Sequence, residues 1–219
     1  LGLLSLSDEL RAEAQAALEG FAQADIRIKI ISGDNPQTVA ALARQAGVSQ
    51  AQAVSGLDLA EMDEAQFVQT AESATVFGRI TPQQKERLVG ALKSRGHYVA
   101  MMGDGVNDVL SLKQAQLGIA MQSGSQATRA VADIVLLQDS FAALPAAFRE
   151  GQRIVRGMAD IMRLFLARTL YVTLLIVCAA MVGMDFPLSP KHNSILALLT
   201  VGIPTVGLAA WARAGTPPP

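Results

Sequence analysis

The sequence predicts an α/β domain with a parallel sheet, followed by two apolar helices long enough to cross a membrane. Short apolar runs alternate with helical patterns through residues 1–140, which is the order that builds a parallel sheet. From residue 141 the pattern becomes helical and strongly apolar. Hydrophobic residues make up 51% of the 219 residues and charged residues only 17%, so a membrane part is expected.

The composition also excludes several classes of function. The net charge is −1, and no basic cluster is dense enough to indicate a nucleic-acid partner. Cys178 is the only cysteine, so the chain has no internal disulfide, and redox chemistry is not expected. The chain starts at Leu1 without a methionine or a signal-peptide pattern, so we expect it to be part of a longer protein.

The expected elements are inferred from apolar periodicity and from capping residues. Strands are predicted at residues 26–31, 75–78, 98–102, 117–121 and 133–137. Helices are predicted at residues 8–24 with Ser7 as a cap, from Pro36 to about Gly47, at 63–72, from Pro82 to about Arg95, and after Asn107 or Asp108 as a cap. Residues 51–74 are otherwise polar and weakly patterned.

The sequence GDGVND at residues 103–108 reads as a tight turn between a buried strand and a helix. Asp104 and Asp108 then lie at the carboxyl end of a strand, where open parallel sheets bind ligands. Two carboxylates this close repel each other, and a hard divalent cation such as Mg²⁺ relieves the repulsion. The alternative is an ordinary turn, because Gly-Asp-Gly is common in turns.

Two further segments resemble parts of a phosphate site. Ser32, Gly33 and Asp34 come after the first predicted strand and precede a helix, whose free N–H groups favour an anion. Lys85 lies in the first turns of a helix that Thr81 caps. Taken alone, these segments are equally consistent with an ordinary loop and a solvated surface lysine.

Together the longer strings closely resemble P-type cation-transporting ATPases, which belong to the haloacid-dehalogenase-like superfamily of phosphoryl-transfer enzymes. Residues 103–108, 118–121 and 132–136 resemble the hinge motif and the segments on its carboxyl side. Residues 32–34 resemble the Thr-Gly-Asp motif with serine for threonine, and residues 79–85 resemble the segment whose lysine meets the phosphorylated aspartate. The resemblance implies a haloacid-dehalogenase-like Rossmannoid parallel sheet.

The resemblance also implies an ATP-driven pump that forms an aspartyl phosphate, with Mg²⁺ as cofactor and ATP as substrate. On the matching positions, Asp104 and Asp108 would form the metal site. Lys85 would neutralise the transferring phosphoryl group, and Ser32, Gly33 and Asn107 would hydrogen-bond its oxygens. The expected catalytic residues are therefore Lys85, Ser32 and Asn107.

One departure from the family is important. The nucleophile of the family lies in Asp-Lys-Thr-Gly, and this string does not occur in the chain. Its strand would lie between residues 26–31 and 98–102, so the sheet is expected to be incomplete and to expose two central edges. We expect the chain alone neither to hydrolyse ATP nor to fold stably. The rest of the pump would supply the nucleophile, nucleotide-binding and actuator parts.

Two alternatives remain from the sequence. One is a membrane-tethered phosphatase of the wider superfamily, which would need a nucleophilic aspartate at the end of a strand. The other is a non-catalytic remnant or partner of an intact pump.

The membrane part is predicted from length and hydropathy. Residues 164–184 span ~31 Å as a helix, which matches a hydrocarbon core of ~30 Å. Arg168 is their only charged residue, and residues 194–212 carry no charge. The expected division is a cytoplasmic domain (1–140), a stalk helix (141–163), a membrane helix (164–184), an extracytoplasmic loop (185–193), a second membrane helix (194–213) and a tail (214–219).

The arginines that precede residue 164 place that side in the cytoplasm and the protein in the cell membrane, with lipid as a partner. A buried helical hairpin in a soluble protein is the alternative. We also expect the long helix to carry movement of the phosphorylated domain to the ion path.

Pro204 interrupts the second apolar segment, frees a backbone carbonyl and, with Thr200, marks an expected ion path. A tolerated kink is the alternative. By resemblance the two segments are the fifth and sixth membrane helices of a pump. They are most similar to a bacterial subgroup linked to calcium, so the transported cation would be Ca²⁺.

Overall fold

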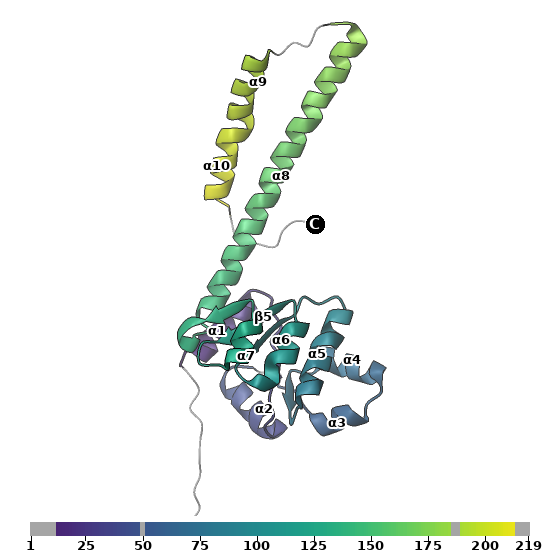
Figure 1. Ribbon diagram of the computed structural model, residues 1–219, viewed down its shortest axis with the longest axis vertical. Coiled ribbons are helices and arrows are strands. Elements are labelled where there is room, and N and C mark those ends of the chain that lie inside the picture. Colours follow the sequence, from purple (N-terminus) through teal and green to yellow (C-terminus); the bar gives the residue numbers. More distant parts are fainter. Residues whose placement is uncertain (1–11, 49–50, 185–188, 213–219) are drawn as a thin grey trace, which may run out of the picture. The chain divides into compact units, whose positions relative to one another are not determined.

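The computed structural model describes residues 12–48, 51–184 and 189–212 (Figure 1). The chain divides into two compact units, Leu1–Pro145 and Ala146–Pro219, and each is described by itself. The predicted cap at Ser7, residues 185–188 of the expected loop and the expected tail at 214–219 lie outside the described residues.

The first unit alternates helices and strands in the predicted way. Its α-helices are α1 (Ala12–Gln23), α2 (Pro36–Gln45), α3 (Gly56–Glu61), α4 (Glu64–Ser73), α5 (Pro82–Ser94), α6 (Val109–Gln114) and α7 (Gln126–Val131). Its strands are β1 (Ile30–Ile31), β2 (Ala53–Ser55), β3 (Val76–Gly78), β4 (Ala100–Gly103), β5 (Leu117–Met121) and β6 (Ile134–Leu136). Two short 3₁₀ turns are η1 (Val106–Asp108) and η2 (Leu137–Asp139).

The strands form two parallel three-stranded sheets, in the orders β1-β3-β2 and β4-β5-β6. The α/β class and the parallel pairing are confirmed, and the described residues contain six strands where five were predicted, because β2 was not expected. β1 and β4 are terminal strands of different sheets. This is the position at which the sequence predicts an absent strand.

Two predicted boundaries need correction. The first strand was expected at residues 26–31, but only Ile30 and Ile31 are paired, because their partner β3 begins at Val76 and offers no register to earlier residues. The segment 51–74, expected to be weakly patterned, contains β2 and α3 as well as the predicted α4. The hydroxyl of Ser55 caps α3 by accepting from the N–H of Leu57, and the N–H of Ser55 donates to the carboxylate of Asp58, a local signal that the polar composition concealed.

The core of the first unit forms around β3, whose residues are all buried. Val76 packs with Val39, Ala40 and Ala43 of α2. Phe77 lies in a second cluster that includes Phe67 of α4 and Leu88 of α5, and all three are essentially without solvent exposure. A strand covered on both faces is expected to be continuously apolar, as β3 is. This core fixes the position of α5 relative to β3.

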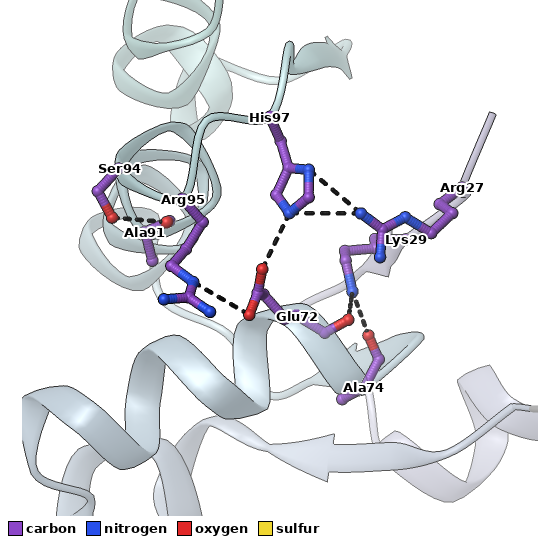
Figure 2. A network of polar contacts seen from close by, with 8 residues as sticks. All are labelled: Arg27, Lys29, Glu72, Ala74, Ala91, Ser94, Arg95 and His97. Carbon is purple, nitrogen blue, oxygen red and sulfur yellow. Dashed lines mark hydrogen bonds and ion pairs between the residues drawn. The ribbon is translucent and has the colours of Figure 1, made fainter.

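A polar cluster links the segments that precede β1 and β4 (Figure 2). The Nη2 atom of Arg27 lies 3.2 Å from Nδ1 of His97, whose Nε2 lies 3.0 Å from Oε1 of Glu72. Arg95 donates from Nε to the other carboxylate oxygen of Glu72 at 3.2 Å. Lys29 donates to the carbonyl oxygens of Glu72 and of Ala74, at 2.9 and 2.7 Å, and so satisfies groups at the end of α4.

The second unit contains most of α8 (Ala143–Val182), a helix of 40 residues, followed by α9 (Pro190–Ala197), the π-helix η3 (Leu198–Gly202) and α10 (Ile203–Ala210). Two helical stretches, Ala143–Val182 and Pro190–Ala210, are long and apolar enough to cross a membrane. The second begins earlier than the predicted residue 194, because Ser189 caps it and Pro190 occupies its first position. Residues 190–193 are therefore helical, not loop.

Candidate functional site

The centre of the candidate site is an ion pair between α5 and the turn after β4. The ammonium of Lys85 lies 2.6 Å from Oδ1 of Asp108, and the two side chains are only 15% and 8% exposed. Thr81 caps α5 as predicted by accepting from the N–H of Gln84, and Pro82 is the first helical residue. The cap fixes the first turn of α5 and therefore the point from which Lys85 extends.

The turn after β4 is shaped around the carboxylate of Asp108. Its Oδ2 accepts from the N–H of Gly105 at 3.2 Å, and its carbonyl oxygen accepts from the buried hydroxyl of Ser111 at 2.9 Å. A Cβ on Gly103 would lie 2.5 Å from the Cβ of Asp108, so only glycine fits there. Asp108 occupies the N-cap position of α6, but its side chain makes no cap hydrogen bond. The expected side-chain cap is therefore wrong, because Asp108 binds Lys85 and Gly105.

Asp104 and Asn107 present their side chains to solvent from the same turn. Neither side chain forms a hydrogen bond or ion pair with another residue in the described part of the chain. Asp104 comes directly after β4, at the carboxyl end of the strand. Its carboxylate is thus available to a ligand, while that of Asp108 is already occupied by Lys85.

The predicted phosphate loop lies at the carboxyl end of β1. The hydroxyl of Ser32 lies 3.2 Å from Oδ2 of Asp34 and accepts from the N–H of Asp34 at 3.1 Å. Gly33 is exposed, and a Cβ there would meet no atom within 4 Å. Asn35 caps α2 by accepting from Gln37, and Pro36 is its first residue, as predicted.

Backbone hydrogen bonds connect this loop to the segment that leads into α5. The N–H of Ile80 donates to the carbonyl of Ser32 at 3.0 Å, and the N–H of Arg79 donates to that of Asp34 at 2.7 Å. Arg79 adopts a left-handed backbone with φ 52° to make this turn. The structure thus joins Lys85 directly to Asp108 and anchors the Ser32 loop beside the start of the helix that carries Lys85.

The donors in this turn fit a Mg²⁺ ion that is shared with a phosphate ligand. Among residues 12–48, 51–184 and 189–212, no group of three or more His, Cys, Asp or Glu side chains could hold a metal by itself. Mg²⁺ is commonly held by one or two carboxylates, with substrate phosphate and water as further ligands. The free carboxylate of Asp104 fits this mode.

Sequence reasoning missed several residues that shape the site. Ser111 holds the carbonyl of Asp108, and Gly103 leaves room for its side chain. In the second unit, the hydroxyl oxygens of Tyr171 on α8 and Thr205 on α10 are buried and have no hydrogen-bond partner among the described residues. In the sequence, a hydroxyl side chain within an apolar segment is the signal that could have identified Thr205.

The predicted ion-path residue Thr200 uses its hydroxyl within its own helical stretch. It donates to the carbonyl of Leu196 at 2.7 Å, four residues earlier. Pro204, the other residue predicted for the ion path, is the second residue of α10 and comes just after the π-helix η3.

The chain is similar to several known proteins. Residues 1–116 match the family described as haloacid dehalogenase-like hydrolase. The chain is 42% identical over 212 residues to the calcium-transporting ATPase CtpE of Mycolicibacterium smegmatis, covering 92% of this chain and 26% of that protein. It is 42% identical over 217 residues to CtpE of Mycobacterium bovis, covering 93% of this chain and 27% of that protein. The chain thus spans about a quarter of the length of these curated relatives.

A solved structure supports the same fold. A zinc-transporting PIB-type ATPase matches 93% of this chain and 27% of its own length, with a TM-score of 0.59 and 24% identity. The match includes both units of the chain, so the likeness of fold is not limited to the sheet domain.

Proposed function

Because the chain belongs to the haloacid dehalogenase-like hydrolase family, we propose that it is the part of an ATP-driven P-type cation pump that holds the transferred phosphoryl group and contributes two membrane helices. The observation that carries the proposal is the Lys85–Asp108 ion pair in the turn that presents the free carboxylate of Asp104. The pump would transfer the terminal phosphoryl group of ATP to an aspartate carboxylate, then release phosphate by hydrolysis.

Each side chain has a distinct task in this proposal. Asp104 holds Mg²⁺, which supplies charge neutralisation to the phosphoryl oxygens when it is bound. Lys85 brings a positive charge to the phosphoryl oxygens, and Asp108 holds the ammonium of Lys85 in position before the phosphoryl group arrives. Ser32, the N–H of Gly33 and Asn107 hydrogen-bond the remaining oxygens. Phosphoryl transfer depends on positioning and charge neutralisation, so these groups match its requirements.

The nucleophilic aspartate lies outside these 219 residues in this proposal. β1 and β4 are terminal strands of two separate sheets, so each offers a free edge. A strand that pairs with both edges would join the sheets and bring its carboxyl end beside the loops of Ser32 and Asp104. We infer that the rest of the protein supplies this strand, together with the nucleotide-binding and actuator parts.

The transported cation is proposed to be Ca²⁺, as the names of the two relatives suggest. The cation would pass between membrane helices that include α8 and α9–α10, with the sheet domain in the cytoplasm. The unpaired buried hydroxyls of Tyr171 and Thr205 support this, because Ca²⁺ is bound by oxygen ligands. Thr200 and Pro204 lie in the same interrupted helical stretch, in which η3 replaces regular α-helix.

The test is ion-dependent phosphorylation of the full-length protein in membranes. With ATP and Mg²⁺, we expect an acid-stable phosphoprotein whose level depends on Ca²⁺ but not on K⁺. Asp104→Asn should reduce its formation by about 10²–10³-fold, whereas Glu61→Gln, an exposed carboxylate outside the site, should not change it. The isolated 219-residue chain should hydrolyse no ATP.

The alternatives predict other outcomes. A membrane-tethered phosphatase would release phosphate from phosphomonoesters with the isolated chain and without any transported ion. A non-catalytic partner would leave the phosphoprotein level unchanged by Asp104→Asn. Either result would overturn the pump assignment.

A further inference from the structure

The position of Asp104 depends on its main chain, because its carboxylate forms no hydrogen bond or ion pair with another side chain in the described residues. The carbonyl oxygen of Asp104 accepts a hydrogen bond of 2.7 Å from the N–H of Ser125. It also lies 3.3 Å from the hydroxyl of Thr128. Both donors come from the segment after β5, which is distant in sequence from the GDGVND turn.

The donors are themselves held by a closed set of hydrogen bonds. The hydroxyls of Ser125 and Thr128 lie 2.8 Å apart, and the hydroxyl of Thr128 lies 2.7 Å from the carbonyl of Ser125. The N–H of Thr128 donates to the hydroxyl of Ser125 at 3.1 Å, which caps α7. Thr128 has no solvent exposure. A buried threonine whose hydroxyl has several partners is rigid, so the N–H of Ser125 has a fixed direction.

The preceding residue leaves no space between the two segments. A Cβ built on Gly124 would lie 3.0 Å from the carbonyl oxygen of Asp104 and 3.1 Å from its Cα. These are backbone atoms, so they cannot rotate away as the end of a long side chain would. Any residue larger than glycine at position 124 must therefore displace either its own loop or Asp104.

From these contacts we propose that Gly124, Ser125 and Thr128 act as positioning residues that fix Asp104 for Mg²⁺. This inference rests on the proposed function and adds a group of residues to it that neither the motif nor the family match assigns. The simpler alternative is that Ser125 and Thr128 only cap α7. The alternatives differ in one respect: a cap affects stability, whereas a positioning group also affects the metal requirement.

The first test measures the Mg²⁺ concentration that gives half-maximal phosphorylation of the full-length protein, together with its melting temperature. Loss of groups that orient metal ligands typically weakens metal binding by about 10–100-fold. The N–H of Ser125 remains in each variant, so we expect an effect at the lower end of this range. Gly124→Ala and Thr128→Val should each raise the Mg²⁺ concentration for half-maximal phosphorylation by about tenfold, and Thr128→Ser should restore the wild-type value. Asp63→Ala removes the cap of α4 and serves as the matched control. It should lower the melting temperature and leave the Mg²⁺ requirement unchanged.

The second test does not depend on phosphorylation. Amide hydrogen exchange of residues 122–128 in the full-length protein should slow when Mg²⁺ and inorganic phosphate are added, because holding Asp104 also holds the N–H of Ser125. Slowed exchange in wild type, absent in Thr128→Val, supports the proposal even if no phosphoprotein forms and the pump assignment fails. The proposal would be overturned if Mg²⁺ and phosphate left exchange unchanged in the wild type. It would also be overturned if the variants lost stability but kept the wild-type Mg²⁺ requirement.

Discussion

Arg27 and His97 form a hydrogen bond of 3.2 Å, although each precedes a terminal strand of a different sheet. The same Nη2 atom lies 3.3 Å from Nε2 of His97, and this Nε2 lies 3.0 Å from Oε1 of Glu72. Because the two sheets share no strand pair in the described residues, this contact helps to hold their amino ends together.

Acid should weaken this cluster through Glu72. The hydrogen bond from His97, followed by the charge and hydrogen bond of Arg95, holds the pKa of Glu72 below its ordinary value of 4.5. A lowered carboxyl pKa gives stability that is complete above 4.5 and is lost as the pH falls through the folded-state value. We expect the melting temperature of the full-length protein in detergent to fall below pH 4.5, and less steeply in Glu72→Gln. Equal slopes for both proteins would contradict this role of Glu72.

Raising the pH above neutrality should increase stability through Lys29. Burial, and next the charge of Arg27, lower the pKa of Lys29 from 10.5 to about 8. Between these values the unfolded chain binds more protons than the folded protein, so stability rises with pH across that window. The melting temperature should therefore contain a component that increases from about pH 8 to 10.5. Lys29→Met should lack this component, whereas Lys113→Met, an exposed lysine, should retain it.

Removing Lys85 should cost both activity and stability. Lys85→Met leaves the buried carboxylate of Asp108 without its cation, and an unpaired buried charge costs about 3 kcal/mol or more. Adding Asp108→Leu should recover stability because an apolar pair can replace a buried ion pair. Phosphorylation should stay about 10²–10³-fold below wild type in both variants. Recovery of phosphorylation in the double variant would show that Lys85 serves only the fold.

Two glycines of the site should respond differently to alanine. Gly103→Ala places a Cβ 2.5 Å from that of Asp108 and must displace the carboxylate from Lys85, so we expect about 2 kcal/mol of destabilisation. Gly33→Ala meets no atom within 4 Å and should leave the melting temperature within about one degree of wild type. Thermal unfolding of the two variants side by side measures the difference. A similar loss for both would mean that space around Asp108 is not limiting.

In the second unit, Thr205→Val removes a buried hydroxyl that has no partner in the described part of the chain. If this oxygen binds the cation, the variant should need about tenfold more Ca²⁺ for phosphorylation while its stability is unchanged or higher, because an unsatisfied polar group costs about 1–3 kcal/mol. Thr173→Val is the matched control, since its hydroxyl already donates to the carbonyl of Thr169 at 2.8 Å. An unaltered Ca²⁺ requirement in Thr205→Val would exclude this oxygen as a ligand.

Sequence patterns identified the elements that local chemistry determines. Thr81 and Pro82 mark the start of α5, and Pro36 marks that of α2, because capping and proline geometry act within one turn. Pairing of distant strands is not local, so the short extent of β1 and the presence of β2 could not be predicted from residues 26–31 or 51–55.

In the site, too, local motifs could be recognised from the sequence, whereas contacts between distant segments could not. The GDGVND turn and Lys85 were identified from motifs, but the pairing of Lys85 with Asp108 depends on how α5 and β4 pack. The role of Thr128 was invisible in the sequence because it joins residues 24 positions apart. The roles of Ser32, Asn107 and Asp104 remain predictions, and Asp104→Asn tests that of Asp104.

The π-helix η3 has a consequence for any alignment of the second membrane helix. A π turn contains about one residue more than an α turn, so the side chains after Gly202 are rotated by about 100° relative to an uninterrupted α-helix. Deleting a single residue from Leu198–Gly202 would restore a continuous α-helix and rotate the whole of α10 about its axis. A relative that is one residue shorter there would present other side chains on the face that Thr205 occupies here, even with every remaining amino acid conserved.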